Sequence, residues 1–473
     1  MAGARRFGET ALILLAIAVR VAAVLVLRSY DVSRSTYEHG EIAANLLAGH
    51  GFSMRFLGAE GPTSQQAPVY PLCVAAAYAL GGVGTPRALL ILELGQSVLG
   101  GLLVWGVLRL ARLVAPGHRW LAAVAGLVVA VHPTLVYAAT HVQVATLGTT
   151  VLVWTLAAGY QAGATGRPRD AVIAGGWLAL LALTDPILSL ASIGVAWAIA
   201  QGRTGVPGRR RQSFRLTTLA IVTGLAGIAP WLARNVQVHG ELVAIKSTFG
   251  YAFWQGNCAL SEGTDKVRRS SVDRIVERSR TAASLSSLNR MLWTARHEAG
   301  YLDDIALTRA DYRLLGSVTE PQRSRILFHR ALAELRAEPW RYLRLCLRRL
   351  RYFLLFDETN PKSRVWAYRV AHLGLTLFAL AGLLLASPGV RSRLLPTIAI
   401  AAALTVFHTL TIVSARFHIP IEPMMALWGA AGLTRWEAGR GGRSTPAPHH
   451  VEGIRVIHGL GLVEQRPSLD SVP

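Results

Sequence analysis

The sequence has little charge and few cysteines. Only 16% of its 473 residues are charged, whereas soluble proteins carry about 25%. Its cysteines, Cys73, Cys258 and Cys346, lie far apart, so they form no metal-binding spacing and at most one disulfide. The net charge of +22 alone would suit a nucleic-acid-binding protein. The low overall charge excludes that class, and it excludes an ordinary soluble enzyme as well.

The sequence contains long apolar runs. Hydrophobic residues make up 52% of the chain, and several runs approach the roughly 20 residues that cross a bilayer as a helix. We therefore predict an all-α integral membrane protein, a polytopic bundle of about 10 (10–12) transmembrane helices. The spans are expected at residues 10–28, 88–108, 120–137, 139–160, 171–184, 186–201, 216–233, 366–386, 394–413 and 420–434.

The basic residues predict the orientation of the chain. Lysine occurs only at positions 246, 266 and 362, and arginines gather beside the spans, most densely in the run 203–215. Arginine-rich loops stay in the cytoplasm and attract anionic lipid. All of these loops share one side only if the short segment 68–83 does not cross the membrane. We predict that this segment is re-entrant or lies in the interface.

Four parts follow from this topology. Residues 1–233 form an N-terminal transmembrane core with a first external loop at 29–67. Residues 234–365 form an external helical region, which ends in an amphipathic helix over 340–356 that lies in the membrane interface. Residues 366–434 are the C-terminal transmembrane helices, and 435–473 form a disordered cytoplasmic tail. The arginine, alanine and glycine content is typical of a GC-rich bacterial genome, so we expect a multi-pass protein of the bacterial cytoplasmic (inner) membrane.

Unusual polar residues converge on the external end of the predicted bundle. Glu38 and Glu41 share a face if their segment is helical, and they are the candidate catalytic pair, since a positioned carboxylate can accept a proton as a general base. Two acids on an ordinary solvated helix are the alternative. Arg234 and Arg416 follow or precede spans and are candidates for binding a donor phosphate. The alternative for them is a long side chain that anchors a helix end.

Further residues at the same end are expected to line the substrate site: His141, Asp185, Asn235, Asn257, His418 and Glu422. Two ionisable residues lie within spans instead. Because such groups usually have a partner, we predict a structural ion pair between Arg20 and Glu93.

Several motifs in order along the chain resemble one family. They are Tyr37–Leu46 with Gly49–Ser53, Pro62–Pro71, Leu183–Pro186, Pro230–Asn235 and Arg416–Pro423. Together they are similar to the GT-C superfamily of membrane glycosyltransferases, in particular the family-39-like group of protein mannosyltransferases and aminoarabinose transferases. Three features depart from that pattern. A glutamate that the family often has after the third external turn is absent from the stretch 141–146, and two positions carry a different residue. An aspartate of the family is Glu38 here, and a basic residue of the family is Asp185.

The resemblance implies transfer of a hexosyl or pentosyl group from a polyprenyl-phosphate sugar to an extracytoplasmic lipid, polysaccharide or protein. The expected partners are therefore this donor, the acceptor and membrane lipids, without nucleic acid. The pattern requires no cofactor, and a divalent metal held by carboxylate oxygens is compatible with it.

Two other functions remain open from the sequence. One is a transporter or flippase for a lipid or polysaccharide, for which two related halves with interrupted helices are typical. The other is a non-catalytic membrane assembly protein. The sequence contains no internal repeat of the kind that the transporter interpretation predicts.

Overall fold

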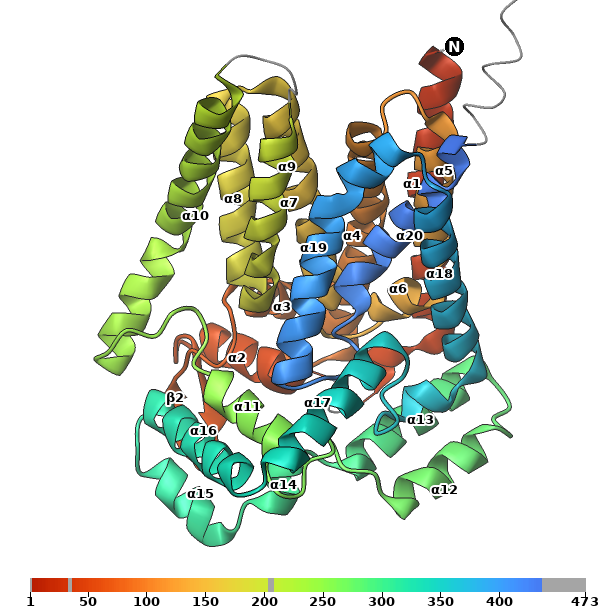
Figure 1. Cartoon of the computed structure of the whole chain (residues 1–473). Coiled ribbons are helices and arrows are strands. Elements are labelled where there is room, and N and C mark those ends of the chain that lie inside the picture. The colour runs from red at the N-terminus through yellow and green to blue at the C-terminus, as the bar shows by residue number, and fades with distance from the viewer. Residues whose placement is uncertain (1, 33–35, 203–207, 436–473) are drawn as a thin grey trace, which may run out of the picture.

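A computed structural model gives the arrangement of residues 2–32, 36–202 and 208–435. Figure 1 shows a helical bundle with two different ends. One end carries the turns rich in arginine, at residues 109–119, 167–169, 209–215 and 388–393, and we call it the arginine end. The opposite end carries a separate layer of short helices, formed by residues 37–62 and 249–354, and we call it the site end. The predicted tail lies outside the described residues, apart from Arg435.

The predicted spans correspond to the helices of the bundle. These are α1 (Ala2–Leu27), α4 (Pro86–Val114), α5 (Arg119–Val131), α6 (Pro133–Ala138), α7 (Ala145–Thr165), α8 (Pro168–Thr184), α9 (Ala191–Gln201), α10 (Arg209–His239), α18 (Trp366–Leu385), α19 (Pro388–Leu410) and α20 (Glu422–Ala431). The expected span 120–137 is divided at Pro133, because proline cannot donate the hydrogen bond that would continue α5. Within the described residues, α1, α4, α10, α18 and α19 are long and apolar enough to cross a membrane.

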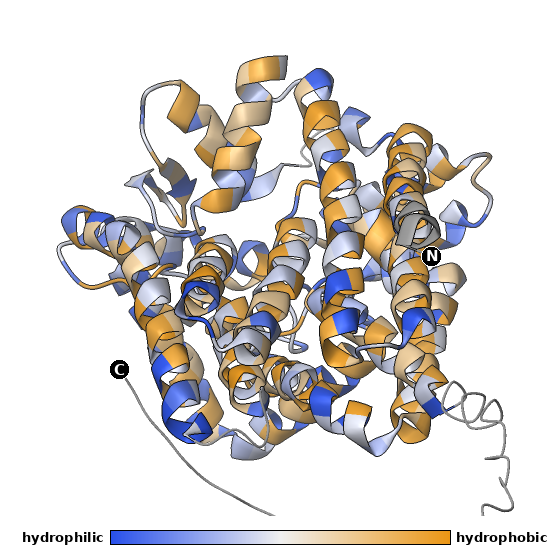
Figure 2. Ribbon diagram, turned by 90° about the horizontal axis from the view of Figure 1, so that it is seen from above, coloured by the Kyte–Doolittle hydropathy of each residue, from blue (hydrophilic) through white to orange (hydrophobic). Residues whose placement is uncertain are grey.

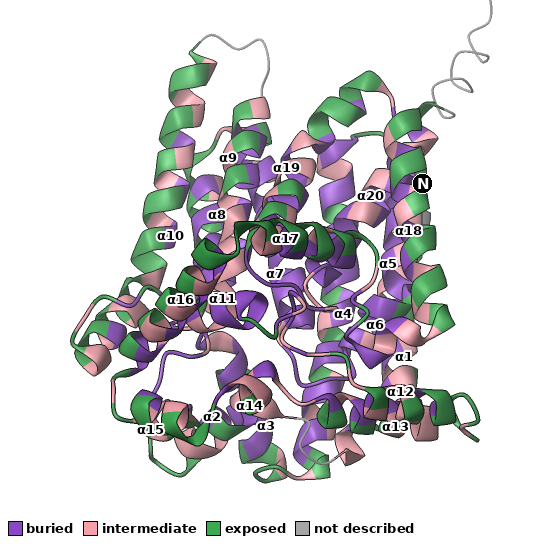
Figure 3. Ribbon diagram, turned by 60° about the horizontal axis from the view of Figure 1, so that its bottom comes forward, coloured by how far each residue is buried: buried purple, intermediate pink, exposed green. Residues whose placement is uncertain are grey.

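The surface of the bundle is apolar where the outer helices face outward. Large side chains such as Leu14 on α1, Leu225 on α10 and Leu377 on α18 are more than half exposed. Figure 2 shows hydrophobic residues on these outer helices, and Figure 3 shows α10 and α18 largely exposed around a buried α7. Such a surface can face lipid tails, because the side chains are apolar and the backbone N–H and C=O groups are hydrogen-bonded within each helix.

Segment 68–83 does not cross the bundle. It forms α3 (Val69–Gly81), whose 13 residues extend about 20 Å, less than the hydrocarbon core of a bilayer. The helix packs on α2 (Tyr37–Leu47) at the site end. The start of α10 consequently lies at the same end as the N-terminus, in the arrangement that the arginines predict.

The layer at the site end is mostly helical, with one small hairpin that the all-α prediction lacks. Its helices are α11 (Phe249–Asn257), α12 (Ser270–Ser279), α13 (Leu285–Ala299), α14 (Leu302–Ala306), α15 (Arg309–Gly316), α16 (Glu320–Ala337) and α17 (Pro339–Leu354). Strands β1 (Ser53–Phe56) and β2 (Ala59–Pro62) pair antiparallel, with Ser53 opposite Pro62. Leu57 and Gly58 join them with φ of 46° and 88°, as a type I′ turn requires.

Helix α17 matches the predicted amphipathic segment in place and in character. Trp340, Leu343 and Leu347 are exposed beside the exposed Arg344 and Arg348. Apolar and arginine side chains on one accessible surface suit the headgroup region of a membrane, so the interfacial location stays our prediction for this helix.

The predicted ion pair between Arg20 and Glu93 does not form between these two described residues. The guanidinium of Arg20 donates instead to the carbonyl oxygens of Val129 and Ala130, at 3.1 and 2.9 Å, and to that of Ala16. The end of α5 therefore provides the acceptors for Arg20, because its last carbonyl groups have no partner within the helix.

Candidate functional site

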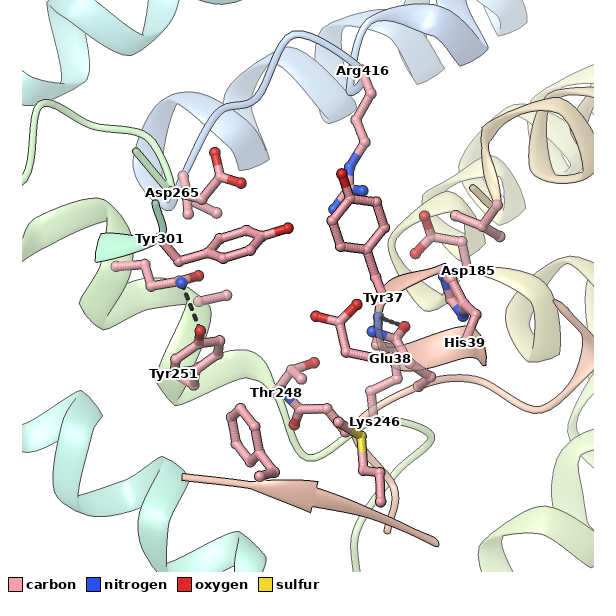
Figure 4. Close-up of a pocket in the computed structure, with 18 of the residues that line it drawn as sticks. Tyr37, Glu38, His39, Asp185, Lys246, Thr248, Tyr251, Asp265, Tyr301 and Arg416 are labelled. Atoms are coloured by element: carbon pink, nitrogen blue, oxygen red, sulfur yellow. Dashed lines mark hydrogen bonds between the residues drawn. The ribbon is translucent and has the colours of Figure 1, made fainter. Parts of the chain in front are cut away.

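A cavity of about 570 Å³ lies between the bundle and the layer at the site end. Figure 4 shows residues from distant parts of the sequence converging on it. The first loop, the start of the turn after α8, the segment after α10 and the turn before α20 all contribute. Its polar lining consists of Tyr37, Glu38, His39, Glu41, Arg55, Gln65, Gln66, Asp185, Lys246, Thr248, Tyr251, Gln255, Asp265, Tyr301, Asp303, Tyr312, His408 and Arg416.

Glu38 points into this cavity from the first turn of α2 (Figure 4). The helix begins at Tyr37, whose φ of 48° is uncommon for a residue with a bulky side chain. The ring of Tyr37 is held by stacking on Trp293 at 6.1 Å and by the guanidinium of Arg296 at 5.1 Å. Surrounding contacts thus stabilise a strained conformation immediately before Glu38, a feature that is frequent at active sites.

The two acids of the predicted pair have different surroundings. The carboxylate of Glu38 forms no hydrogen bond or ion pair with another described residue, so it is free to contact a substrate. Glu41 also lines the cavity, but it is exposed and accepts a hydrogen bond of 2.6 Å from the backbone N–H of Arg55. Glu41 therefore holds the hairpin against α2.

Lys246 brings a cation close to the carboxylates. Its Nζ donates to Oε1 of Gln66 at 3.0 Å. Burial lowers the pKa of Lys246, while the charges of Asp185 and Glu38 oppose that shift. Lys246 and the acids of the cavity therefore stabilise one another's charged forms.

A second group of cations lies where the cavity narrows behind Arg416. Arg416 lines both the cavity and an adjoining space of about 30 Å³, which Arg296 and Lys362 also line. We call Arg296, Lys362 and Arg416 the cationic group. No acidic residue lines this space in the described part of the chain. Burial, followed by the charges of Arg296 and Arg416, holds the pKa of Lys362 well below its usual range.

The contacts of the cationic group leave room for an anion. Neither Arg296 nor Arg416 has a carboxylate within ion-pair distance among the described residues. Nζ of Lys362 is 3.2 Å from Nε2 of His141 and 4.1 Å from the ring centre of Tyr137. Three cations without a neutralising carboxylate repel one another, and a bound anion would relieve this repulsion.

An apolar cavity of about 320 Å³ continues from the cationic group. It shares Thr134, Tyr137, Lys362 and Tyr368 with the narrow space. The rest of its lining is mainly apolar and comes from the site ends of α1, α6 and α18 and from α13: Leu27, Pro133, Val136, Leu285, Leu288, Leu292, Val365 and Ala367. Acidic, cationic and apolar spaces thus follow one another at this end of the bundle.

His39 lies on the wall of the large cavity beside Asp185 (Figure 4). Burial, with smaller contributions from Lys246 and Arg416, lowers the pKa of His39 to about 3. Its imidazole is therefore neutral at physiological pH, and it packs edge-on against the ring of Tyr70 at 4.8 Å.

Arg234 and Asn235 are outside the lining of the cavity. Arg234 donates to the carbonyl oxygens of Phe52 and Thr63, at 3.0 and 2.6 Å, and to the hydroxyl of Ser64. Asn235 is fully buried and also binds Ser64. These contacts tie the first loop to α10, so the two residues position the loop that carries Glu38.

Of the other predicted residues, one lines the cavity and the rest bond or pack against neighbouring segments. Asp185 lines the cavity. Asn257 is buried and bonds the carbonyl oxygen of Thr411 and the guanidinium of Arg349. His141 stacks on Trp293 at 4.9 Å and contacts Lys362. His418 and Glu422 form a buried group of their own behind Arg416.

The residues that sequence reasoning missed include Lys246, Asp265 and Tyr301. One signal pointed to part of this set, namely the rarity of lysine. All three lysines lie at the site: Lys246 on the large cavity, Lys362 in the cationic group, and the buried Lys266 with its ammonium 4.1 Å from the ring centre of Tyr301.

No protein-family model and no curated protein matches this sequence, but solved structures match the fold. The oligosaccharyltransferase AglB from Archaeoglobus fulgidus, in complex with an inhibitory peptide and a dolichol-phosphate, is similar with a TM-score of 0.52 and 14% identity, over 93% of this chain and 52% of that one. ArnT from Cupriavidus metallidurans, bound to undecaprenyl phosphate, has a TM-score of 0.41 and 16% identity, over 95% and 82%.

The similarity to the oligosaccharyltransferase confirms the predicted fold, a helical membrane-protein bundle shared with that structure. The chain spans about half the length of that relative.

Proposed function

We propose that this protein is a membrane glycosyltransferase that moves a sugar from a polyprenyl-phosphate donor to an acceptor at the site end. One observation carries the proposal. An acidic cavity, a cationic group without carboxylate partners and an apolar cavity adjoin in that order. A polyprenyl-phosphate sugar has the matching order of sugar, phosphate and hydrocarbon.

The reaction is a displacement at the anomeric carbon of the donor sugar. Glu38 accepts the proton of the acceptor's nucleophilic group as its oxygen or nitrogen forms the new bond to that carbon. The bond between the anomeric carbon and the phosphate oxygen breaks, and its electron pair leaves with the polyprenyl phosphate. The free carboxylate of Glu38 at the cavity supports this role, whereas Glu41 supports the hairpin through Arg55.

The cationic group stabilises the negative charge that develops on the leaving phosphate. Arginine side chains bind phosphate oxygens through a planar fork of N–H groups, and their effect is largest where water is excluded. Arg416 borders both the large cavity and the narrow space, so it lies where the sugar and the phosphate of the donor meet. Arg234 has its donors directed to the first loop, and we assign it to the loop rather than to the phosphate.

The hydrocarbon of the donor occupies the apolar cavity between α1, α13 and α18. This cavity lies at the ends of bundle helices whose outer surfaces are apolar, and a polyprenyl chain can enter it from the membrane. The acceptor approaches the opposite side of the large cavity, beside Asp185 and Lys246. The proposal includes the bacterial cytoplasmic membrane as location, with the site end on its external face.

Transfer in proteoliposomes with a panel of polyprenyl-phosphate sugars tests this function. Glu38→Gln keeps the shape of the side chain but cannot accept a proton, so we expect turnover to fall about 10²- to 10⁴-fold. Glu60→Gln is the matched control, because Glu60 is an exposed acid of the same loop paired only with Arg55. Assays with and without added divalent cations show whether a metal takes part.

Two results would contradict the proposal. Normal turnover in Glu38→Gln would remove the assignment of the base. Movement of the labelled lipid across the bilayer without formation of a glycosidic bond would instead support the flippase alternative.

A further inference from the structure

Three histidines and a glutamate form a buried group behind the turn that carries Arg416. His132 follows α5, His372 lies on α18, and His418 and Glu422 flank the short 3-10 helix η4 (Ile419–Ile421). The side chains of all four are at most 6% exposed, and Glu422 is fully buried. None of them lines the large cavity, so the group is separate from the proposed reaction site.

The carboxylate of Glu422 lies between two imidazole nitrogens. Its Oε1 is 3.3 Å from Nε2 of His418, and its Oε2 is 3.3 Å from Nδ1 of His132. Neither contact is a well-formed hydrogen bond, because both oxygens of Glu422 and Nδ1 of His132 lack a hydrogen-bond partner. A buried carboxylate without donors is costly, so this arrangement requires a compensating positive charge.

Two of the histidines are oriented as metal ligands usually are. Nε2 of His372 faces the carbonyl oxygen of Leu354 at 3.0 Å, and its Nδ1 is buried without a partner. Nε2 of His132 faces the carbonyl oxygen of Ala371 at 3.4 Å, which leaves Nδ1 toward Glu422. A backbone carbonyl on one ring nitrogen fixes the tautomer in which the other nitrogen binds a metal.

The distances agree with a tetrahedral ion. With Zn–N and Zn–O bonds of about 2.0–2.2 Å, adjacent donor atoms of a tetrahedron lie about 3.3–3.5 Å apart. The pair from His418 and Glu422 already has this separation, and the donor atoms of His372, His418 and Glu422 all lie within 4.8 Å of one another. Binding of an ion would draw these three donor atoms closer together.

We propose that His372, His418 and Glu422 bind a divalent transition-metal ion, with Zn²⁺ the best fit, and that His132 contacts the second carboxylate oxygen or takes the fourth position. Imidazole and carboxylate ligands in this number suit Zn²⁺. The hydroxyl of Tyr368, 3.2 Å from Nε2 of His418, gives up that contact when the nitrogen binds the ion.

The ion would fix the turn between α19 and α20 against α5 and α18. His418 and Glu422 come from this turn, and Arg416, in the same turn, precedes His418 by two residues. The metal is thus a positioning element for the turn, and its existence does not depend on the proposed transferase activity. A proton shared between Glu422 and a histidine is the competing way to compensate the carboxylate.

Metal content of the full-length protein in detergent tests the proposal. The protein is stripped with a chelator, loaded with Zn²⁺ and freed of excess ion, and the bound metal is measured by mass spectrometry. We expect about one tightly bound ion per chain, a spectrum of tetrahedral Co²⁺ on cobalt substitution, and a higher unfolding temperature in the loaded protein.

Glu422→Gln and His372→Gln identify the ligands, with the exposed His50→Gln as control. We expect the affinity of either ligand variant to fall by more than the roughly 10- to 100-fold that loss of a supporting group costs, while His50→Gln retains the parent's affinity. Circular dichroism and gel filtration confirm folding of each variant before metal is added.

Two outcomes would overturn the proposal: a parent protein that takes up no ion after loading, or equal affinity in the parent and both ligand variants. The first would establish the shared proton, and the second would show binding elsewhere on the chain.

Discussion

Arg416→Ala separates phosphate binding from structural anchoring. The guanidinium of Arg416 borders the cavity and the narrow space, and it has no carboxylate partner among the described residues. Its removal therefore costs little in the folded protein itself. A charge-assisted bond to a phosphate contributes roughly 1.5–3 kcal/mol, and each 1.4 kcal/mol corresponds to about tenfold in affinity. We expect Arg416→Ala to weaken donor binding by about 10- to 150-fold.

Arg416→Lys should recover only part of this loss, because a single ammonium cannot reproduce the planar fork of a guanidinium. The assay is isothermal titration of the purified protein with a short-chain polyprenyl phosphate, together with the unfolding temperature from intrinsic tryptophan fluorescence. Both measurements are made on the same samples, so a change in affinity can be distinguished from a loss of folded protein.

Arg234→Ala is the matched comparison and should give the opposite result. This substitution leaves the carbonyl oxygen of Thr63 without its donor and removes one of the two donors to that of Phe52. A buried group left unsatisfied costs about 1–3 kcal/mol. We expect a lower unfolding temperature for Arg234→Ala and a near-normal affinity in the fraction that stays folded. The reasoning is refuted if Arg416→Lys binds the donor as the parent does, or if Arg234→Ala loses affinity without losing stability.

Two further predictions concern titration. Burial and neighbouring cations hold the pKa of Lys362 well below its usual range, and a phosphate bound beside Lys362 should raise this pKa because the anion stabilises the ammonium. Donor binding is then accompanied by proton uptake, measured by calorimetry in buffers of different ionisation enthalpy; Lys362→Met should abolish the uptake, and equal uptake in both proteins would contradict the assignment. The pKa of His39 is lowered to about 3 from about 6.5 in the unfolded chain. The folded state therefore resists protonation, and its stability falls as the pH decreases from 6.5 toward 3. His39→Gln should flatten this dependence in thermal unfolding measured across that range, and an unchanged slope would exclude His39 as its cause.

Much of the fold could be predicted because lipid imposes a simple rule on the chain. Apolar runs of sufficient length and the placement of arginines define the helices and the two ends. Run length and arginine placement do not predict features that depend on tertiary contacts. The hairpin was missed because its turn is Leu57-Gly58, which lacks the Asn-Gly or Asp-Gly signal of a type I′ turn.

The prediction for Arg20 failed for a related reason. The similar depth of Arg20 and Glu93 within their predicted spans suggested that the two residues pair. The free carbonyl groups at the end of α5 are equally good acceptors for Arg20. Helix ends offer such groups wherever the bundle places them. Their use by a side chain more than 100 residues away, as with Val129 and Ala130, cannot be deduced from the spacing of charged residues.

For the site, topology explains what the sequence could and could not predict. Reasoning from span ends collected residues of one membrane face, and both Glu38 and Arg416 do line the cavity. The same reasoning could not distinguish a side chain directed into the cavity from one bonded to a neighbouring loop. Arg234 and Asn235 are of the second kind, because they bond Thr63 and Ser64 of the loop that carries Glu38.

The surroundings of the three lysines suggest why a chain so rich in arginine has lysine at these positions. Lys246, Lys266 and Lys362 all lie at the site. Burial is the largest cause of the lowered pKa of each lysine. An arginine there would remain charged and would repel Arg296 and Arg416 whether or not an anion were bound. Burial lowers the pKa of a lysine while the site is free, and a phosphate bound nearby raises that pKa again. Lysine in place of arginine at these positions thus lowers the electrostatic repulsion in the unliganded site, and it keeps the attraction for the proposed donor.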